Sequence, residues 1–548
     1  MIKIVDDQNE VEKAYSYLKE KFPEVSKLQR DPLKSLDYKT AIELAEKNLD
    51  RDSFILNCGA SNDPSLWYLS ELGYKHLYGM DLDKNITDMP YYWRIKYMYG
   101  SMVDTHLPSN MFDALISIST IEHGNGMEQA KAFLREAKRV LKDGGILMFS
   151  TDYSEGHIDT RGDTKYGVGW HIFDRQEVKS IIGYAKSIGF GLYAKSGFPE
   201  QRTALVYNKR LKKGFSFILL AFVLKKPAKL KKIKEVNILY PYLDKVDGLS
   251  KYSYALAEKF RQVGVKPHLY KSEEKIKNKH LPTVAPYDDT VFKSLPKNKN
   301  TVMETFSYPA NKKVIFNNIF RIIGPGSALW RDPVGSVRRF KKAEKDMSAL
   351  EEYPLLVYNN EFGGAYFKKY TIMPHIAYPK MRYKKKGKAG LCLGAFGFAF
   401  RIKHFDKICE LAKRLGVKAV LVVSATNVNE KAKKESLEVM EELKRYESAK
   451  IRIVDSYDDA RTLSELSACT HIIFAQDDAR NISGSMRFCM QLGVPVVSTD
   501  TYQAREAQTH RVKSLDEITI DYLKKTKEPT RLDDGFTYLL RFLESGYA

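Results

Sequence analysis

Short apolar runs alternate with amphipathic stretches along most of the chain, and this alternation limits the choice of fold more than any other feature. The runs at 54–58, 235–242 and 418–425 have the length of buried strands. Each is followed by a segment of helical length with apolar residues at helical spacing. Such alternation is typical of parallel sheets whose strands are joined by crossover helices. The sequence therefore predicts α/β architecture throughout.

The chain is too long for one domain, because a single core rarely grows past roughly 250–300 residues and this chain has 548. Two basic segments without apolar periodicity, Lys225–Lys234 and Lys380–Gly390, are each followed at once by a strand pattern. The segment Lys271–Lys345 is too weakly patterned to assign. We therefore predict domains at 1–228, 233–380 and 388–548.

Composition and cysteine usage indicate a globular chain of the cytoplasm. Apolar residues make up 43% and charged residues 29% of the sequence, which suits a soluble protein. The longest apolar run, Phe215–Leu224, is about half of what a membrane-spanning helix needs, and no signal peptide is expected. The five cysteines form no C-x-x-C pair, which favours reduced thiols, a cytoplasmic location and no metal site.

The positive charge is concentrated in the second part of the chain. Residues 1–230 carry a net charge of +3, and the remaining residues carry +18 of the total of +21. Such a field attracts nucleotide diphosphates, nucleic acid or an acidic membrane surface, and peripheral contact with such a membrane is compatible with it. A solvated surface rich in Lys and Glu explains the charge equally well.

A turn of small residues, 59–63, follows the strand pattern at 54–58, and Pro64 then opens a helix. Such a turn lets the backbone approach a ligand closely and points free N–H groups at it. Some 20 residues later a second strand pattern ends at Asp81, the position of the acid that binds a ribose hydroxyl in a dinucleotide fold. This pair predicts a nucleotide site but is not specific, because similar turns arise by chance.

Further landmarks follow in a set order: Asp104, a strand pattern at 112–123, the RVLKDGG turn at 139–145, and GWHIFDRQEV at 169–178. Together they resemble class I S-adenosylmethionine (SAM)-dependent methyltransferases over residues 35–226. The resemblance implies a Rossmann-like fold with SAM as the cofactor. It places the methionine part at Asn57, Gly59, Ala60 and Ser61, the ribose at Asp81 with Leu82 beside it, the adenine at Asp104, and Ser117 and Ser119 along the site.

Methyl transfer needs an in-line nucleophile and sometimes a base. His123 and His171 are the candidate bases, and the alternative that each only caps or packs a helix start stays open. Enzymes of this fold that methylate amino groups of nucleic acids usually carry an Asn/Asp-Pro-Pro-aromatic turn here. This chain has Ser-Thr-Ile-Glu-His at 119–123 instead, which favours methylation of an oxygen on a small molecule or glycan.

The second part of the chain contains two more strand–helix patterns with phosphate-type loops. They are Asp247–Ser250, Gly397 with Lys403–Asp406, and Ser483–Ser485 before the strand pattern LGVPVVSTD. These resemble GT-B glycosyltransferases, in which two Rossmann-like domains close over a sugar nucleotide, so that the whole chain would have three Rossmann-like units. The resemblance implies that the donor sugar nucleotide binds at Gly248, Arg401, Lys403, Ser483, Gly484 and Ser485.

General chemistry agrees with a phosphate site, since helix N-termini and lysines bind anions. An ordinary N-cap at Ser483–Ser485 is the alternative. The paired glutamates usual in this family are absent, and Arg480 and Phe488 stand in their places.

Three functions are compatible with these observations. The leading one is a bifunctional transferase that adds and methylates sugars during synthesis of a surface glycan or glycoconjugate, with a glycan or glycolipid acceptor. In the second, the methyltransferase is active and the remaining half is a non-catalytic module that binds glycans or nucleotides. The third is a nucleic-acid-modifying methyltransferase whose basic half grips phosphates. No aromatic–basic RNA signature or zinc knuckle supports this third function.

Overall fold

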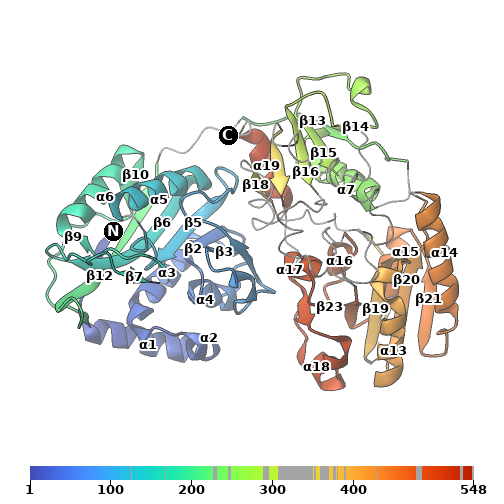
Figure 1. Ribbon diagram of the computed structural model, residues 1–548, viewed down its shortest axis with the longest axis horizontal. Helices are drawn as coiled ribbons and strands as arrows, with labels where there is room; N and C mark the ends of the chain where they lie inside the picture. The colour runs from blue at the N-terminus through green and yellow to red at the C-terminus, as the bar shows by residue number, and fades with distance from the viewer. Residues whose placement is uncertain are drawn as a thin grey trace. The chain divides into compact units, whose positions relative to one another are not determined.

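The structure is a computed structural model that describes residues 1–124, 126–165, 167–225, 231–244, 248–287, 295–305, 350, 353–357, 370–373, 378, 381–387, 390–427, 429–476, 484–530 and 535–545. Contacts divide the chain into two compact units. The first consists of Met1–Lys231 with Leu540–Ala548, and the second of Lys232–Leu539. Both are built from helices and largely parallel sheets (Figure 1), which confirms the predicted α/β class.

The first unit is built on a ten-stranded sheet with the order β1-β12-β6-β5-β2-β3-β4, to which β9, β10 and β11 add at the β6 and β12 positions. The strands are β1 (Ile2–Val5), β2 (Phe54–Cys58), β3 (His76–Asp81), β4 (Ile95–Tyr99), β5 (Phe112–Ile118), β6 (Leu141–Ser154), β9 (Phe173–Asp174), β10 (Phe190–Leu192), β11 (Val206–Asn208) and β12 (Lys213–Leu224). A small hairpin, β7 (Thr164–Lys165) with β8 (Val168–Gly169), lies outside this sheet.

Five strands that are neighbours in the sheet, β6, β5, β2, β3 and β4, are parallel to one another. In contrast, β12 runs antiparallel to β6. The chain builds β2, β3 and β4 outward in one direction and then returns to add β5 and β6 on the other side of β2. Strand order therefore reverses between β2 and β5. The long apolar run 215–224 forms most of β12, whose side chains are buried on both faces.

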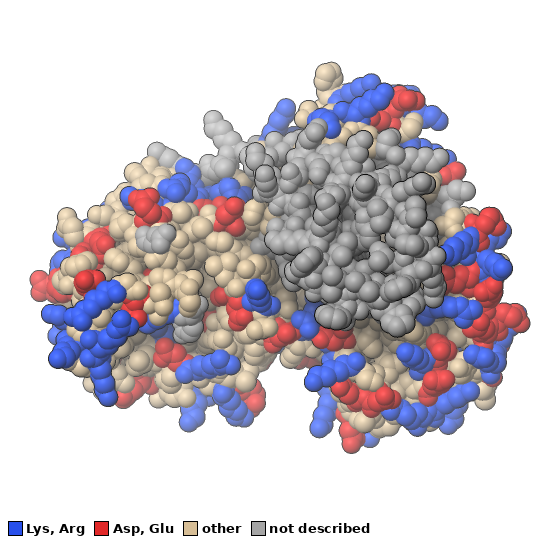
Figure 2. Space-filling view, in the orientation of Figure 1, with Lys and Arg blue, Asp and Glu red and all other residues tan. Residues whose placement is uncertain are grey.

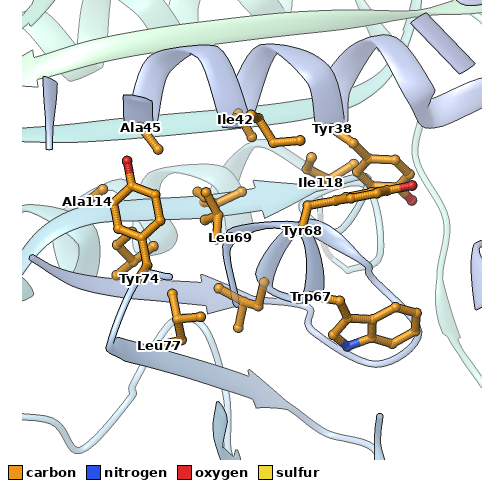
Figure 3. Close-up of a cluster of buried hydrophobic side chains, with 14 of the residues drawn as sticks. Tyr38, Ile42, Ala45, Trp67, Tyr68, Leu69, Tyr74, Leu77, Ala114 and Ile118 are labelled. Atoms are coloured by element: carbon orange, nitrogen blue, oxygen red, sulfur yellow. The ribbon is translucent and has the colours of Figure 1, made fainter. Parts of the chain in front are cut away.

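Helices cover both faces of this sheet (Figure 1). They are α1 (Gln8–Lys21), α2 (Pro23–Leu28), α3 (Ser35–Asn48), α4 (Ser65–Glu71), α5 (Gly126–Val140) and α6 (Arg175–Ser187). On one face, Tyr38, Ile42 and Ala45 of α3 lie above Leu69 of α4 and Ile118 of β5 (Figure 3). This packing holds the start of α3 close to the carboxyl ends of the strands.

The aromatic members of this core are also hydrogen-bonded. The buried Trp67 donates from Nε1 to the Tyr97 hydroxyl at 2.8 Å, and Tyr68 donates to Oε1 of Gln29 at 2.7 Å. Because buried polar groups are costly when unpaired, these bonds fix the orientation of α4 on the sheet. The loop that joins β2 to α4 is thereby held in place.

The second unit contains two six-stranded parallel sheets. The first has the order β14-β13-β15-β16-β17-β18 and the second β21-β20-β19-β22-β23-β24. The first sheet consists of β13 (Glu235–Leu239), β14 (Lys266–Tyr270), β15 (Thr283–Tyr287), β16 (Thr301–Thr305), β17 (Leu355–Val357) and β18 (Thr371–Ile372). The second consists of β19 (Cys392–Phe398), β20 (Lys418–Ser424), β21 (Ile451–Asp455), β22 (His471–Phe474), β23 (Val496–Thr499) and β24 (His510–Val512).

The helices of the second unit include α7 (Gly248–Gln262), α13 (Phe405–Leu415), α14 (Glu430–Lys444), α15 (Asp459–Leu466), α16 (Gly484–Cys489), α17 (Tyr502–Glu506) and α18 (Ile520–Lys525), and α19 (Gly535–Glu544) follows. In the second sheet α13 and α14 pack on one face and α15 and α16 on the other. Strand order in this sheet reverses between β19 and β22. Among the described residues, no helix has the length and apolar character needed to cross a membrane.

We predict that residues 1–228 fold without the rest of the chain, because the whole ten-stranded sheet lies within them. The isolated fragment should show mixed α/β circular dichroism and a single cooperative thermal transition. A fragment that melts without a cooperative transition would contradict this prediction.

Candidate functional site

The reversal of strand order between β2 and β5 places several loops at one edge of the first sheet. In open α/β sheets, ligands bind outside the carboxyl ends of the strands at such a reversal. The loops that follow β2, β3, β4 and β5 all leave from this edge. The residues predicted to bind SAM are on these loops and strand ends.

Gly59 is the point at which the β2 loop meets the β5 loop. Its φ is +89°, and a Cβ atom there would lie 2.0 Å from Oγ1 of Thr120, just beyond β5. The amides of Gly59 and Ala60 both donate to the Met80 carbonyl, at 2.8 and 3.1 Å. The prediction that this loop offers free N–H groups is therefore wrong for these two residues, because the neighbouring strand β3 already accepts from them.

Asp81 joins the end of β3 to the same loop. Its Oδ2 accepts from the Ser61 amide at 3.0 Å, and its Oδ1 accepts from the Asp83 amide at 2.9 Å. The Ser61 hydroxyl in turn donates to Asp83 at 2.7 Å. A carboxylate has about four lone-pair sites, so Asp81 keeps acceptor capacity for a further donor such as a ribose hydroxyl.

Three buried polar atoms at this edge have no hydrogen-bond partner among the described residues. They are Oδ1 of Asn57 and the hydroxyl oxygens of Ser117 and Ser119. The amide nitrogen of Asn57 donates to Asp63 at 3.0 Å, and burial raises the pKa of Asp63. Because unpaired buried polar atoms are rare in proteins, these atoms fit a site for a polar group such as the methionine part of SAM.

The two residues predicted near the adenosine lie at the rim of the edge. Leu82, directly after β3, is 55% exposed and so presents an apolar surface at this rim. Asp104 is also exposed and lies 3.6 Å from Nε2 of His106. An apolar side chain and an exposed acceptor, carried by the loops that follow β3 and β4, suit an adenine base.

The two candidate bases differ in their surroundings. His171 lies 3.0 Å from both carboxylate oxygens of Glu177 in the first turn of α6, so its ring is held at a helix start, as the packing alternative supposed. His123 is partly buried, and burial lowers the pKa of its imidazole. The backbone amide of His171 donates to the Glu122 carbonyl at 2.8 Å, which brings both loops together.

The sequence analysis missed a set of buried charges beside these loops. Burial, followed by repulsion from Asp152, raises the pKa of Glu122 to about 8. Burial likewise raises the pKa of Asp37 to about 6, and the Ser150 hydroxyl donates to Asp37 at 2.8 Å. Lys34 is buried with them. The available signal was that Glu122 and Asp152 each come directly after an apolar strand pattern.

In the second unit, Lys403 and Ser485 are brought together as predicted for a donor site. Lys403 donates from Nζ to the Ser485 hydroxyl at 3.2 Å, and a Cβ on Gly397 would lie 2.5 Å from that same Nζ. Burial lowers the pKa of Lys403 to about 8. No carboxylate of the described residues forms an ion pair with this ammonium.

Not all of the other residues predicted to bind the donor sugar nucleotide lie beside Lys403 and Ser485. Arg401 forms ion pairs with Glu438 and Glu442 of α14, at 3.5 and 2.8 Å, and its side chain is 53% exposed. Gly248 begins α7, Gly484 begins α16 beside the Tyr378 hydroxyl, and Ser483 lies outside the described residues. Because α16 has only six residues, a helix dipole adds little here.

Charged side chains of both signs share the surface of the second unit. Figure 2 shows Lys and Arg mixed with Asp and Glu over α13 and α14, and pairs such as Lys444 with Glu441 account for part of this mixture. Among the described residues, no group of three or more His, Cys, Asp or Glu is arranged to hold a metal ion.

The match to known proteins falls on the loops described above. Residues 56–149 match a family model described as a methyltransferase domain. No curated protein sequence matches the chain. This part of the chain is therefore similar to methyltransferase domains.

Solved structures similar to this chain include methyltransferases. A SAM-dependent methyltransferase from Mesorhizobium loti is 15% identical, with 33% of this chain and 96% of that chain covered and a TM-score of 0.25. A 1,6-didemethyltoxoflavin-N1-methyltransferase from Burkholderia thailandensis, with bound 1,6-didemethyltoxoflavin and S-adenosylhomocysteine, is 14% identical. It covers 41% of this chain and 95% of its own, with a TM-score of 0.26.

We predict that Gly59→Ala destabilises the first unit more than Gly73→Ala does. Both glycines have positive φ, but a Cβ at Gly73 meets nothing within 4 Å. The left-handed backbone costs each variant about 1–2 kcal/mol, and overpacking against Thr120 should cost Gly59→Ala about 1–3 kcal/mol more. Urea unfolding of both variants measures the difference, and equal losses would show that Thr120 does not pack on this loop.

Proposed function

We propose that the first unit is a SAM-dependent methyltransferase that methylates an oxygen of a small molecule or glycan. The observation that carries the proposal is the hydrogen bond from the Ser61 amide to Asp81, which joins the glycine turn to the end of β3 at the strand-order reversal. These residues lie within the segment that matches the methyltransferase family. Bound SAM supplies a methyl carbon made electrophilic by its sulfonium.

Each part of the edge has a task in this proposal. The remaining acceptor sites of Asp81 hold the ribose hydroxyls, while the exposed Leu82 and Asp104 receive the adenine. The unpaired atoms of Asn57, Ser117 and Ser119 face the polar methionine part. Positioning of this kind is itself a large part of catalysis, since it removes translational and rotational freedom before reaction.

Asp81→Ala should weaken SAM binding by about 1.5–3 kcal/mol, the scale of a hydrogen bond to a charged group, which is roughly tenfold or more in affinity. Calorimetric titration of the full chain measures this loss. Asp52→Ala is the matched control, because Asp52 is an exposed aspartate paired with Lys75 outside the site. Unchanged SAM affinity in Asp81→Ala would reject the assignment of this edge.

For the second unit we propose a nucleotide-sugar site centred on Lys403, and with it a glycosyltransferase that acts with the first unit in synthesis of a glycoconjugate in the cytoplasm. The supporting observation is the ammonium of Lys403, which is partly buried and has a single hydroxyl partner among the described residues. A desolvated cation of this kind is stabilised by an anion, and a diphosphate is one. A module that binds the nucleotide without catalysis is the alternative.

If Lys403 binds a diphosphate, UDP and related nucleoside diphosphates should raise the melting temperature of the full chain. Lys403→Ala should weaken this binding by about 1.5–3 kcal/mol, whereas Lys418→Ala, at the exposed start of β20, should not. Affinity for UDP should also fall as pH rises past about 8, where Lys403 loses its proton. A melting shift with nucleic acid and none with any nucleoside diphosphate would favour a nucleic-acid-modifying enzyme instead.

A further inference from the structure

Four ionisable side chains gather near the carboxyl ends of β5 and β6, and we refer to them as the Glu122 cluster: Lys34, Glu122, Asp152 and Lys165. Asp152 lies at its centre. Its Oδ2 accepts from Nε1 of Trp170 at 2.8 Å and lies 3.5 Å from Nζ of Lys165, and its Oδ1 lies 4.0 Å from Nζ of Lys34. The Thr151 hydroxyl donates to Oε2 of Glu122 at 3.2 Å.

Lys34 points to a ligand at this cluster. Its side chain is only 8% exposed, and its Nζ has no hydrogen-bond partner among the described residues. The ammonium lies 3.0 Å above the ring of Phe217, which does not replace a hydrogen-bond acceptor. Because a buried cation without such acceptors is costly, a polar group of a bound molecule is the expected partner.

The strand order places the Glu122 cluster next to the proposed SAM site, on the side where the molecule that receives the methyl group would bind. Thr120 packs against Gly59, and Glu122 follows Thr120 by two residues in the same loop. Asp152 ends the apolar part of β6, which is the neighbour of β5 on the side away from β2. A molecule bound over β6 therefore meets SAM bound over β2 and β3 at the β5 loop.

We propose that the carboxylate of Glu122 takes the proton of the acceptor nucleophile during methyl transfer, and that Asp152 is a positioning residue for it. This inference rests on the proposed methyltransferase function. In the step, a lone pair of the acceptor atom forms a bond to the methyl carbon while the carbon–sulfur bond breaks. The bonding pair goes to sulfur, which becomes a neutral thioether, and the acceptor's proton goes to Glu122.

Charge in the cluster favours Glu122 over His123 as the proton acceptor. A proton on Glu122 removes the cost of a buried negative charge and the repulsion between that charge and Asp152. These are the two main causes of the raised pKa of Glu122. A proton on His123 would add a cation near Lys165 and Lys34. Burial lowers the pKa of His123, Asp152 opposes this effect, and the two lysines add to it. His171, which precedes β9, contacts Glu122 through its backbone amide, while its ring contacts Glu177 of α6.

A basic role for Glu122 limits the chemical class of the molecule that receives the methyl group. A base is needed only where the nucleophile still holds its proton at neutral pH, as an alcohol or an alkylammonium does. A carboxylate acceptor would be attracted by Lys34 and Lys165 but would need no base. The acceptor is therefore an alcohol or an amine, and an alcohol agrees with the preference for oxygen methylation.

The test compares SAM with S-adenosylhomocysteine, which lacks the methyl group and the sulfonium charge. If Glu122 lies beside the reacting atoms, the sulfonium stabilises its carboxylate, lowers its pKa and drives proton release on binding. Calorimetry of the full chain at pH 7.5, in buffers of different ionisation enthalpy, counts the protons released. SAM should release on the order of half a proton more than S-adenosylhomocysteine.

Variants assign the proton to one residue. Glu122→Gln should bind both ligands but release equal numbers of protons with each, whereas His123→Asn should keep the difference. Asp152→Asn should keep the difference in proton release between the two ligands. The pH at which this difference is largest should be lower, because the repulsion that raises the pKa of Glu122 is removed. Equal release with both ligands in the parent chain, or a difference lost in His123→Asn but kept in Glu122→Gln, would overturn the proposal. Absence of SAM binding in the parent chain would instead overturn the methyltransferase function itself.

Discussion

The close approach of Gly59 to Thr120 is the contact on which the arrangement of the first unit depends. It joins the first parallel strand, β2, to the strand added on its other side, β5. Only a residue without a side chain fits there, because both the positive φ and the space are closed to a Cβ. The contact directs the β2 loop toward Asp81 and the β5 loop toward Asp152. The proposed cofactor and acceptor regions therefore lie on either side of this contact.

Desolvation acts on one ionisable group in each unit, Glu122 in the first and Lys403 in the second. Burial moves the pKa of Glu122 upward and that of Lys403 downward, so that both groups titrate near pH 8. Groups held near neutral pH by burial are rare on ordinary surfaces and are concentrated at functional sites. The cost of burying them lowers stability, and a bound ligand of opposite charge or a transferred proton offsets part of that cost.

Local patterns predicted much of the fold and some of the site. The strand, turn and helix around Gly59 and the acid at Asp81 depend on residues close in sequence. The pair of Lys403 with Ser485 joins residues distant in sequence, and only the resemblance to a known family placed them in one site. In contrast, β15 and β16 in the segment 271–345 are short and carry few apolar residues. They are strands because parallel neighbours on both sides pair with them, which local periodicity does not report.

The Glu122 cluster could not be predicted because it is assembled from segments distant in sequence. Lys34 comes from a 3₁₀ turn before α3, Glu122 from the β5 loop and Asp152 from β6. Arg401 shows that closeness in sequence does not ensure a shared site. It lies two residues before Lys403 but pairs with Glu442 of α14. Tertiary contacts decide such cases. Burial and partner choice are properties of the folded chain.

The central claim, that the edge over β2 and β3 binds SAM, is tested most directly by a crystal structure of the full chain with S-adenosylhomocysteine. We expect the ribose hydroxyls within hydrogen-bond distance of the Asp81 carboxylate, the adenine against Leu82, and the sulfur facing the loop that leads from Thr120 to Glu122. S-adenosylhomocysteine bound elsewhere on the chain, or with its ribose away from Asp81, would contradict this account.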